Sequence, residues 1–134
     1  MQHPWLKNYD EGVPYSLEPY PKQTLLDILS DTVRQRPNHT SLIFKGRHLS
    51  YSEIERLSDA FANALVALGV KKGDRVVLIL PNSPQSILTQ LGVWKAGGIA
   101  VPINPLYTEH ELERLFLECG AETVVVLTRF YEKV

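Results

Sequence analysis

The side chains in this chain that could do chemistry are four histidines, one cysteine and a glutamate-rich stretch near the end. The histidines are scattered, with no carboxylate or cysteine at the spacing that metal sites use: His3, His39, His48 and His110. The cysteine, Cys119, would need a histidine partner to act as a nucleophile and is more simply a core residue on a helix face. We therefore expect no metal ligand and no catalytic residue in either group.

The glutamates would be candidates for paired-carboxylate catalysis if they faced a cleft: Glu109, Glu111, Glu113 and Glu118. They also suit the solvated surface of a helix, where acidic residues near the N-terminus interact favourably with the helix dipole. We favour the solvated surface, which also accounts for His110 as an exposed residue.

A nucleotide site in an α/β protein usually needs a glycine-rich turn at the start of a helix. The eight glycines form no G-x-G-x-x-G and no Walker A pattern, and none follows a serine or threonine. The turn Pro81-Asn82-Ser83-Pro84 follows an apolar run, but its prolines lack N–H donors. A plain connecting turn is favoured over a phosphate site, and we expect no cofactor-binding residue in the chain.

Composition limits the remaining classes of function. The chain has 134 residues, 44% hydrophobic and 22% charged, with a net charge of −1. The absence of a basic patch argues against nucleic-acid binding. No apolar run is long enough to span a bilayer, and no signal peptide opens the chain. We therefore expect a cytoplasmic protein that does not bind nucleic acid and does not cross a membrane.

The elements that would position any site follow from hydrophobic period and capping signals. Residues 1–22 are rich in proline and in Trp5 and tyrosines, so we expect an irregular segment that lies against a surface. A helix is predicted from about Thr24 to before Pro37, with Leu25, Leu29 and Val33 on one face.

A hairpin with its turn at Lys45-Gly46-Arg47 comes next. Ser50 and Glu53 are predicted to form a capping box at the start of the next helix. One face of this helix is apolar and should be buried: Ile54, Leu57, Phe61, Leu65 and Leu68.

Three apolar runs then alternate with two helical segments. The predicted strands are 75–80, 99–103 and 123–127. Ser83 and Thr108 are the predicted N-caps of the helices between them, and Gly120 ends the second helix. Short links in this order predict a parallel sheet from a βαβαβ unit. The fold class is α/β, a three-layer partial domain preceded by a helix and a small hairpin.

Three motifs along the chain resemble the adenylate-forming (AMP-binding) superfamily. The stretch 49–54 (Leu-Ser-Tyr-Ser-Glu-Ile) is similar to its first core motif, and 94–105 (Trp-Lys-Ala-Gly-Gly-Ile-Ala-Val-Pro-Ile-Asn-Pro) to its second. Gly73–Val76 with Leu80–Ser83 looks like the strand and turn between them. Residues 4–14 resemble the start of long-chain fatty-acyl-CoA ligases, and residues 104–113 are similar to fatty-acyl- and aryl-CoA ligases. Amino-acid-activating domains more often carry an acidic residue where Asn104 stands.

The resemblance implies a two-step reaction in a longer enzyme, which uses ATP, magnesium and coenzyme A to convert a fatty acid to its thioester. It implies that residues 23–134 begin a large N-terminal domain, and that the phosphate loop, the ribose-binding aspartate and the C-terminal lysine lie downstream. No catalytic, cofactor-binding or metal residue is carried over, so we expect the chain alone to be inactive. Its partners would be the rest of the polypeptide and, in self-association, a second copy, and the longer enzyme could be peripheral at a membrane. An aryl-CoA ligase, an amino-acid adenylation domain and an independent α/β interaction or ligand-binding module remain the alternatives.

Overall fold

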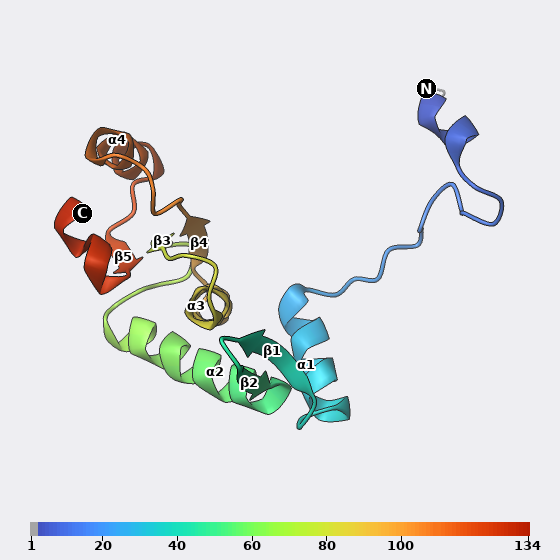
Figure 1. Cartoon of the computed structure of the whole chain (residues 1–134), viewed down its shortest axis with the longest axis horizontal. Coiled ribbons are helices and arrows are strands. Elements are labelled where there is room, and N and C mark those ends of the chain that lie inside the picture. Colours follow the sequence, from blue (N-terminus) through green and yellow to red (C-terminus); the bar gives the residue numbers. More distant parts are fainter. Residues whose placement is uncertain (1–2) are drawn as a thin grey trace.

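The computed structural model describes residues 3–134. After a short 3-10 helix, η1 (Pro4–Asn8), the chain forms α1 (Leu25–Gln35) and the strands β1 (Thr40–Phe44) and β2 (Arg47–Ser50). The helix α2 (Tyr51–Ala67) then leads into alternating strands and helices. These are β3 (Arg75–Ile79), α3 (Pro84–Lys95), β4 (Ile99–Pro102), α4 (Glu109–Cys119), β5 (Thr123–Val126) and the 3-10 helix η2 (Thr128–Lys133). Figure 1 shows all of them along the ribbon.

The hairpin forms because its turn residues tolerate a left-handed backbone. Strands β1 and β2 pair antiparallel with Phe44 opposite Arg47, which leaves Lys45 and Gly46 as the two turn residues. Their φ angles are +49° and +78°, the combination that favours glycine at the second position. The predicted hairpin is therefore confirmed.

Each of the four α-helices begins with a capping box. Ser50 accepts a hydrogen bond from the Glu53 amide (3.3 Å), and the Glu53 carboxylate accepts one from the Ser50 amide (2.8 Å). Thr108 and Glu111 repeat this arrangement at α4, as predicted, and Ser83 caps α3 with Ser86 as its partner. The fourth box, between Thr24 and Asp27 at α1, was not predicted.

The three-stranded sheet has the order β4-β3-β5, with both pairs parallel. The central strand is buried on both faces, with Val76, Val77, Leu78 and Ile79 at most 4% exposed. This confirms the predicted βαβαβ unit. Each strand ends one residue before its apolar run does, at Ile79, Pro102 and Val126, although the Ile103 and Leu127 amides still donate to carbonyls of β3.

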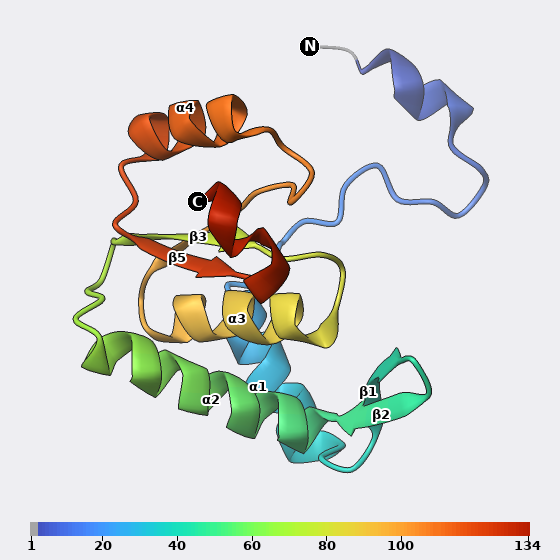
Figure 2. The ribbon, with the colours of Figure 1, turned by 60° about the vertical axis from the view of Figure 1, so that its left-hand side comes forward.

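Helices cover the two faces of the sheet unequally. Figure 2 shows α4 on one face, with α3 and then α2 on the other. Leu65 of α2 and Val93 of α3 pack with Val76 and Leu78 on the second face. On the first face, Leu112 of α4 joins a smaller cluster with Val77, Ile79 and Ile103.

Two predicted core positions are wrong. Leu68 is 79% exposed, because it is the C-cap residue that follows α2, beyond the part of the helix that faces α3 and the sheet. Leu25 is 63% exposed, because the inner face of α1 is formed instead by Leu26, Leu29 and Val33. The other predicted residues of the α2 face are buried or half-buried.

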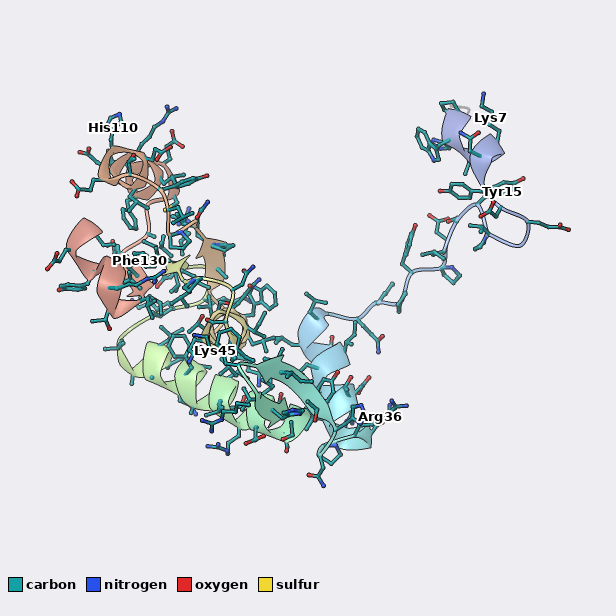
Figure 3. All side chains as sticks on the ribbon, viewed as in Figure 1. Lys7, Tyr15, Arg36, Lys45, His110 and Phe130 are labelled. Atoms are coloured by element: carbon teal, nitrogen blue, oxygen red, sulfur yellow. The ribbon has the colours of Figure 1, made fainter. Side chains whose placement is uncertain are left out.

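The segment before α1 does not lie against the body of the molecule. Figure 1 shows it reaching away from the rest of the chain, and Tyr15, labelled in Figure 3, lies near η1 and far from the other helices and the strands. Its exposed aromatic side chains range from 43% to 77% exposure: Trp5, Tyr9, Tyr15 and Tyr20. The expectation of a covered segment is wrong: its aromatic side chains are exposed, and its backbone hydrogen bonds, such as those from Leu6 to His3 and from Tyr9 to Leu6, join near neighbours.

Candidate functional site

The carboxyl edge of the parallel sheet is where ligands bind in open α/β folds. A cavity of about 460 Å³ lies at this edge, between the hairpin turn and the ends of β3 and β5. Its lining comes from four elements and includes Phe44, Lys45, Leu80, Pro81, Thr89 and Leu127. Most of these side chains are apolar, so the cavity suits an apolar group better than a charged one.

The polar groups at this cavity are already engaged within their own elements. The Thr89 hydroxyl, only 8% exposed as a residue, donates to the Ser86 carbonyl (3.2 Å). The ammonium of Lys45, labelled in Figure 3, lies 5.6 Å from the centre of the Phe44 ring. The cavity thus offers one cation at its edge and no preformed polar cluster among the described residues that line it.

The start of α3 does not fit the phosphates of ATP. Pro84 at the first helical position has no N–H, and the Ser86 amide donates to the Ser83 hydroxyl (3.4 Å). The Ser86 hydroxyl in turn donates to the Ser83 carbonyl (2.8 Å). Within residues 3–134, no group of three His, Cys, Asp or Glu side chains is arranged to hold a metal ion such as magnesium. We therefore derive no catalytic step through ATP or magnesium at these residues.

The structure does not bring the four histidines together. His110 and Glu113 are 3.9 Å apart on the outer surface of α4, with side chains 92% and 73% exposed. His3 contacts the Trp5 ring in the N-terminal segment, and His48 lies in β2 opposite Ile43. His39 is engaged through its backbone: its amide donates to the Arg36 carbonyl (3.1 Å) and its carbonyl accepts from the Tyr51 amide (3.1 Å). Figure 3 shows His110 pointing away from the sheet.

The acidic residues of α4 serve the helix. The Thr108 backbone amide and the Thr108 hydroxyl both donate to the Glu111 carboxylate. Both hydrogen bonds lower the pKa of Glu111, the backbone one more strongly. The same pair of donors from Ser50 lowers the pKa of Glu53. Cys119 is half-buried against the cluster of Val77 and Ile79, as expected for a helix-face cysteine.

The Gly97-Gly98 pair allows two loops to approach closely. Gly97 has a φ of +82°, and its carbonyl accepts from the Gly73 amide (2.9 Å). A Cβ atom on Gly98 would lie 3.2 Å from the Asp74 carbonyl oxygen, which itself accepts from the Ile99 amide (2.8 Å). The pair therefore sets the register in which β4 enters the sheet beside β3.

One cluster of charges was missed by sequence reasoning. The Lys95 ammonium lies 2.7 Å from the Asp59 carboxylate and 3.0 Å from the Glu55 carboxylate. The Glu55 contact is Coulombic, because its buried Oε2 does not meet the geometry of a hydrogen bond. Glu55 and Asp59 are four residues apart on one face of α2, which was the only signal in the sequence. The cluster joins α2 to α3.

None of the helices in the described part of the chain is long and apolar enough to cross a membrane.

Comparison with known proteins identifies the family. The model of the family described as AMP-binding enzyme matches residues 29–134. A long-chain-fatty-acid–CoA ligase of Bacillus subtilis (strain 168) is 41% identical over 98% of this chain. The phosphinothricin tripeptide synthetase PhsC of Streptomyces viridochromogenes is 32% identical over 82% of it. The chain spans 23% of the first relative and 10% of the second.

Solved structures agree with the family match. The anthranilate CoA ligase AuaEII, in complex with anthranoyl-AMP, superposes with a TM-score of 0.78 at 30% identity, over 81% of this chain and 21% of the other. A Mycobacterium tuberculosis fatty acyl CoA synthetase gives a TM-score of 0.75 at 27% identity, over 79% of this chain and 22% of the other. Since the family model covers most of the chain, including all three of the motifs recognised in the sequence, the chain belongs to the AMP-binding enzyme family.

Proposed function

We propose that this chain is the N-terminal part of a long-chain fatty-acid–CoA ligase. The observation that carries the proposal is how far each match extends. The Bacillus subtilis ligase matches 98% of the chain and an Escherichia coli O157:H7 ligase 97%, so both include most of the segment before residue 29, where the family model begins. The peptide synthetase matches 82%. The fatty-acid ligases thus match nearly the whole chain, and the peptide synthetase matches a smaller part of it.

The reaction of such an enzyme has two balanced steps. The fatty-acid carboxylate attacks the α-phosphorus of ATP and releases pyrophosphate, and the thiolate of coenzyme A then attacks the acyl carbonyl and releases AMP. Nothing at the start of α3 fits the phosphates, so residues 23–134 would contribute the first part of a larger N-terminal domain. In that role they would fix the positions of the elements that carry the active site.

An aryl-CoA ligase is the second candidate, because the anthranilate CoA ligase superposes with a TM-score of 0.78. An amino-acid adenylation domain has less support, since the peptide synthetase matches less of the chain and at lower identity than the Bacillus subtilis ligase does.

The test is the substrate profile of the protein translated from the complete reading frame. Hexadecanoate, anthranilate and a set of amino acids would be compared by ATP-dependent pyrophosphate release with coenzyme A present. We expect kcat/KM for hexadecanoate to exceed that for anthranilate by at least about 100-fold. Preference for anthranilate would support the second candidate. Amino-acid adenylation without thioester formation to coenzyme A would contradict both.

A further inference from the structure

A polar cavity lies where α1 ends and α2 begins. Pro37 ends α1, because the residue before a proline is disfavoured in the helical region, and Arg36 takes φ −141° and ψ 54°. The chain then folds back onto the start of α2: the Tyr51 amide donates to the His39 carbonyl (3.1 Å) and the Ser52 amide to the Pro37 carbonyl (3.0 Å). A cavity of about 310 Å³ lies at this turn. Figure 1 shows both helix ends on the side of the molecule away from β5 and η2.

The lining of this cavity carries positive charge and no carboxylate. It is formed by Thr32, Gln35, Arg36, His39 and Tyr51. The Arg36 guanidinium is charged at every pH at which the chain is folded, and the other four side chains supply an imidazole, an amide and two hydroxyl groups. The ends of α1 and α2 meet here with opposed dipoles, so the side chains decide the sign of the local potential. The cavity therefore favours an anion.

The groups that remain to meet a ligand here are mainly hydrogen-bond donors. Within residues 3–134, the side chains of Arg36, His39 and Tyr51 have no hydrogen-bond or ion-pair partner. The acceptors beside them are already used: the Thr32 carbonyl accepts from the Arg36 amide (2.8 Å) and the Arg36 carbonyl from the His39 amide (3.1 Å). The Thr32 hydroxyl donates to the Ile28 carbonyl (2.7 Å). The free donors thus come from three segments: the end of α1, the turn and the start of α2.

We propose that this cavity binds a small phosphorylated molecule through its phosphate group. A guanidinium donates two parallel N–H groups to two oxygens of a phosphate. The Tyr51 hydroxyl and the His39 imidazole are then available to its third terminal oxygen. A carboxylate has only two oxygens and a single charge, so it would leave part of this donor set unused. The volume of about 310 Å³ stands at the lower end of the range for small-molecule sites, which limits the rest of the ligand to a small organic group.

Isothermal titration calorimetry with inorganic phosphate tests the proposal, with the ionic strength held constant by sodium chloride. It is done with this chain and with the protein translated from the complete reading frame. Arg36→Gln, at the position labelled in Figure 3, removes the cation and keeps a polar side chain. Arg34→Gln is the matched control, because Arg34 pairs with Asp31 and does not line the cavity. We expect Arg36→Gln to raise the dissociation constant at least about tenfold and Arg34→Gln to leave it within about twofold.

Two further measurements connect the binding to this cavity. Tyr51→Phe removes one hydroxyl and should weaken phosphate binding by about threefold. Acetate should bind the unmodified chain at least about tenfold more weakly than phosphate, a comparison that needs no variant to fold. Circular dichroism checks the fold of each variant.

Three results would overturn the proposal. They are the absence of saturable phosphate binding, equal losses in Arg36→Gln and Arg34→Gln, and binding by this chain that the complete protein does not share. The last result would mean that other parts of the complete protein cover the cavity. Equal affinity for acetate and phosphate in the unmodified chain would likewise contradict a phosphate site.

Discussion

Individual residues hold this fold by local hydrogen bonds more than by any reactive group. Ser50 and Thr108 are examples. Each has a hydroxyl group that accepts a hydrogen bond from a backbone amide in the first turn of a helix. Substituting either residue should therefore change the free energy of unfolding of the chain.

Ser50→Ala should destabilise the chain by about 1 kcal/mol, because the Glu53 amide loses its acceptor at the start of α2. The measurement is the free energy of unfolding in urea. Ser30→Ala, in the exposed middle of α1, is the control and should change it by less than about 0.5 kcal/mol. A Ser50→Ala effect as small as the control would show that the capping box is not formed in solution.

Gly92 tests how closely α2 and α3 pack. A Cβ atom at this position would lie 2.6 Å from Cδ1 of Phe61 and 3.1 Å from the Ser58 carbonyl oxygen. Helix propensity alone would make Gly92→Ala stabilising by about 1 kcal/mol. We expect the opposite sign, a loss of roughly 1–3 kcal/mol, because the Ser58 backbone must move.

A double-mutant cycle, measured by urea unfolding, tests whether the contact with Phe61 causes this loss. Gly92→Ala should cost less in a Phe61→Ala background, where the closest atom has been removed. Stabilisation by Gly92→Ala in the otherwise unchanged chain would mean that the two helices have room for a methyl group.

At the scale of elements, Lys95 links α3 to α2 from a side chain that is only 14% exposed. Lys95→Met should destabilise the chain by about 1–2 kcal/mol, because it leaves the Glu55 and Asp59 carboxylates close together without a cation. The destabilisation should not be larger, because the Asp59 side chain is 53% exposed and solvent screens its charge.

Arg114→Met is the matched control for Lys95→Met, since Arg114 pairs with Glu118 within α4 and both side chains are more than half exposed. Its effect should stay below about 0.5 kcal/mol. Equal effects of the two substitutions on urea unfolding would show that Lys95 does not connect the helices.

The sequence predicted the elements better than their assembly. The structure confirms the capping boxes at Ser50 and Thr108 and the turn at Lys45–Gly46. These features depend on residues that are only a few positions apart. The Lys95 cluster and the Gly92 contact join residues about 30 to 40 positions apart, which no local pattern encodes. The N-terminal segment was misplaced because aromatic content alone does not specify a surface to cover it.

At the scale of the whole molecule, residues 3–134 show neither a start of α3 that fits phosphates nor a cluster of side chains arranged to hold a metal ion. We predict that residues 1–134 alone, supplied with ATP, magnesium and a fatty acid, release no pyrophosphate above the uncatalysed rate. The physical reason is that the start of α3 spends its donors on Ser83 and Ser86, and no carboxylate cluster lies nearby among the described residues. Turnover that depends on this chain would contradict the prediction.

The position of β3 in the sheet has a consequence for synthesis on the ribosome. β3 lies in the middle of the order β4-β3-β5, yet it emerges before both of its partners. Its valines and isoleucine, buried on both faces in the finished sheet, must wait for the chain to reach Val126. At roughly 5–20 residues per second, that wait lasts on the order of seconds. β3 lacks both partners until β4 has emerged and still lacks one until β5 has emerged, which makes this interval the period when a nascent chain is most exposed to misfolding and to chaperones.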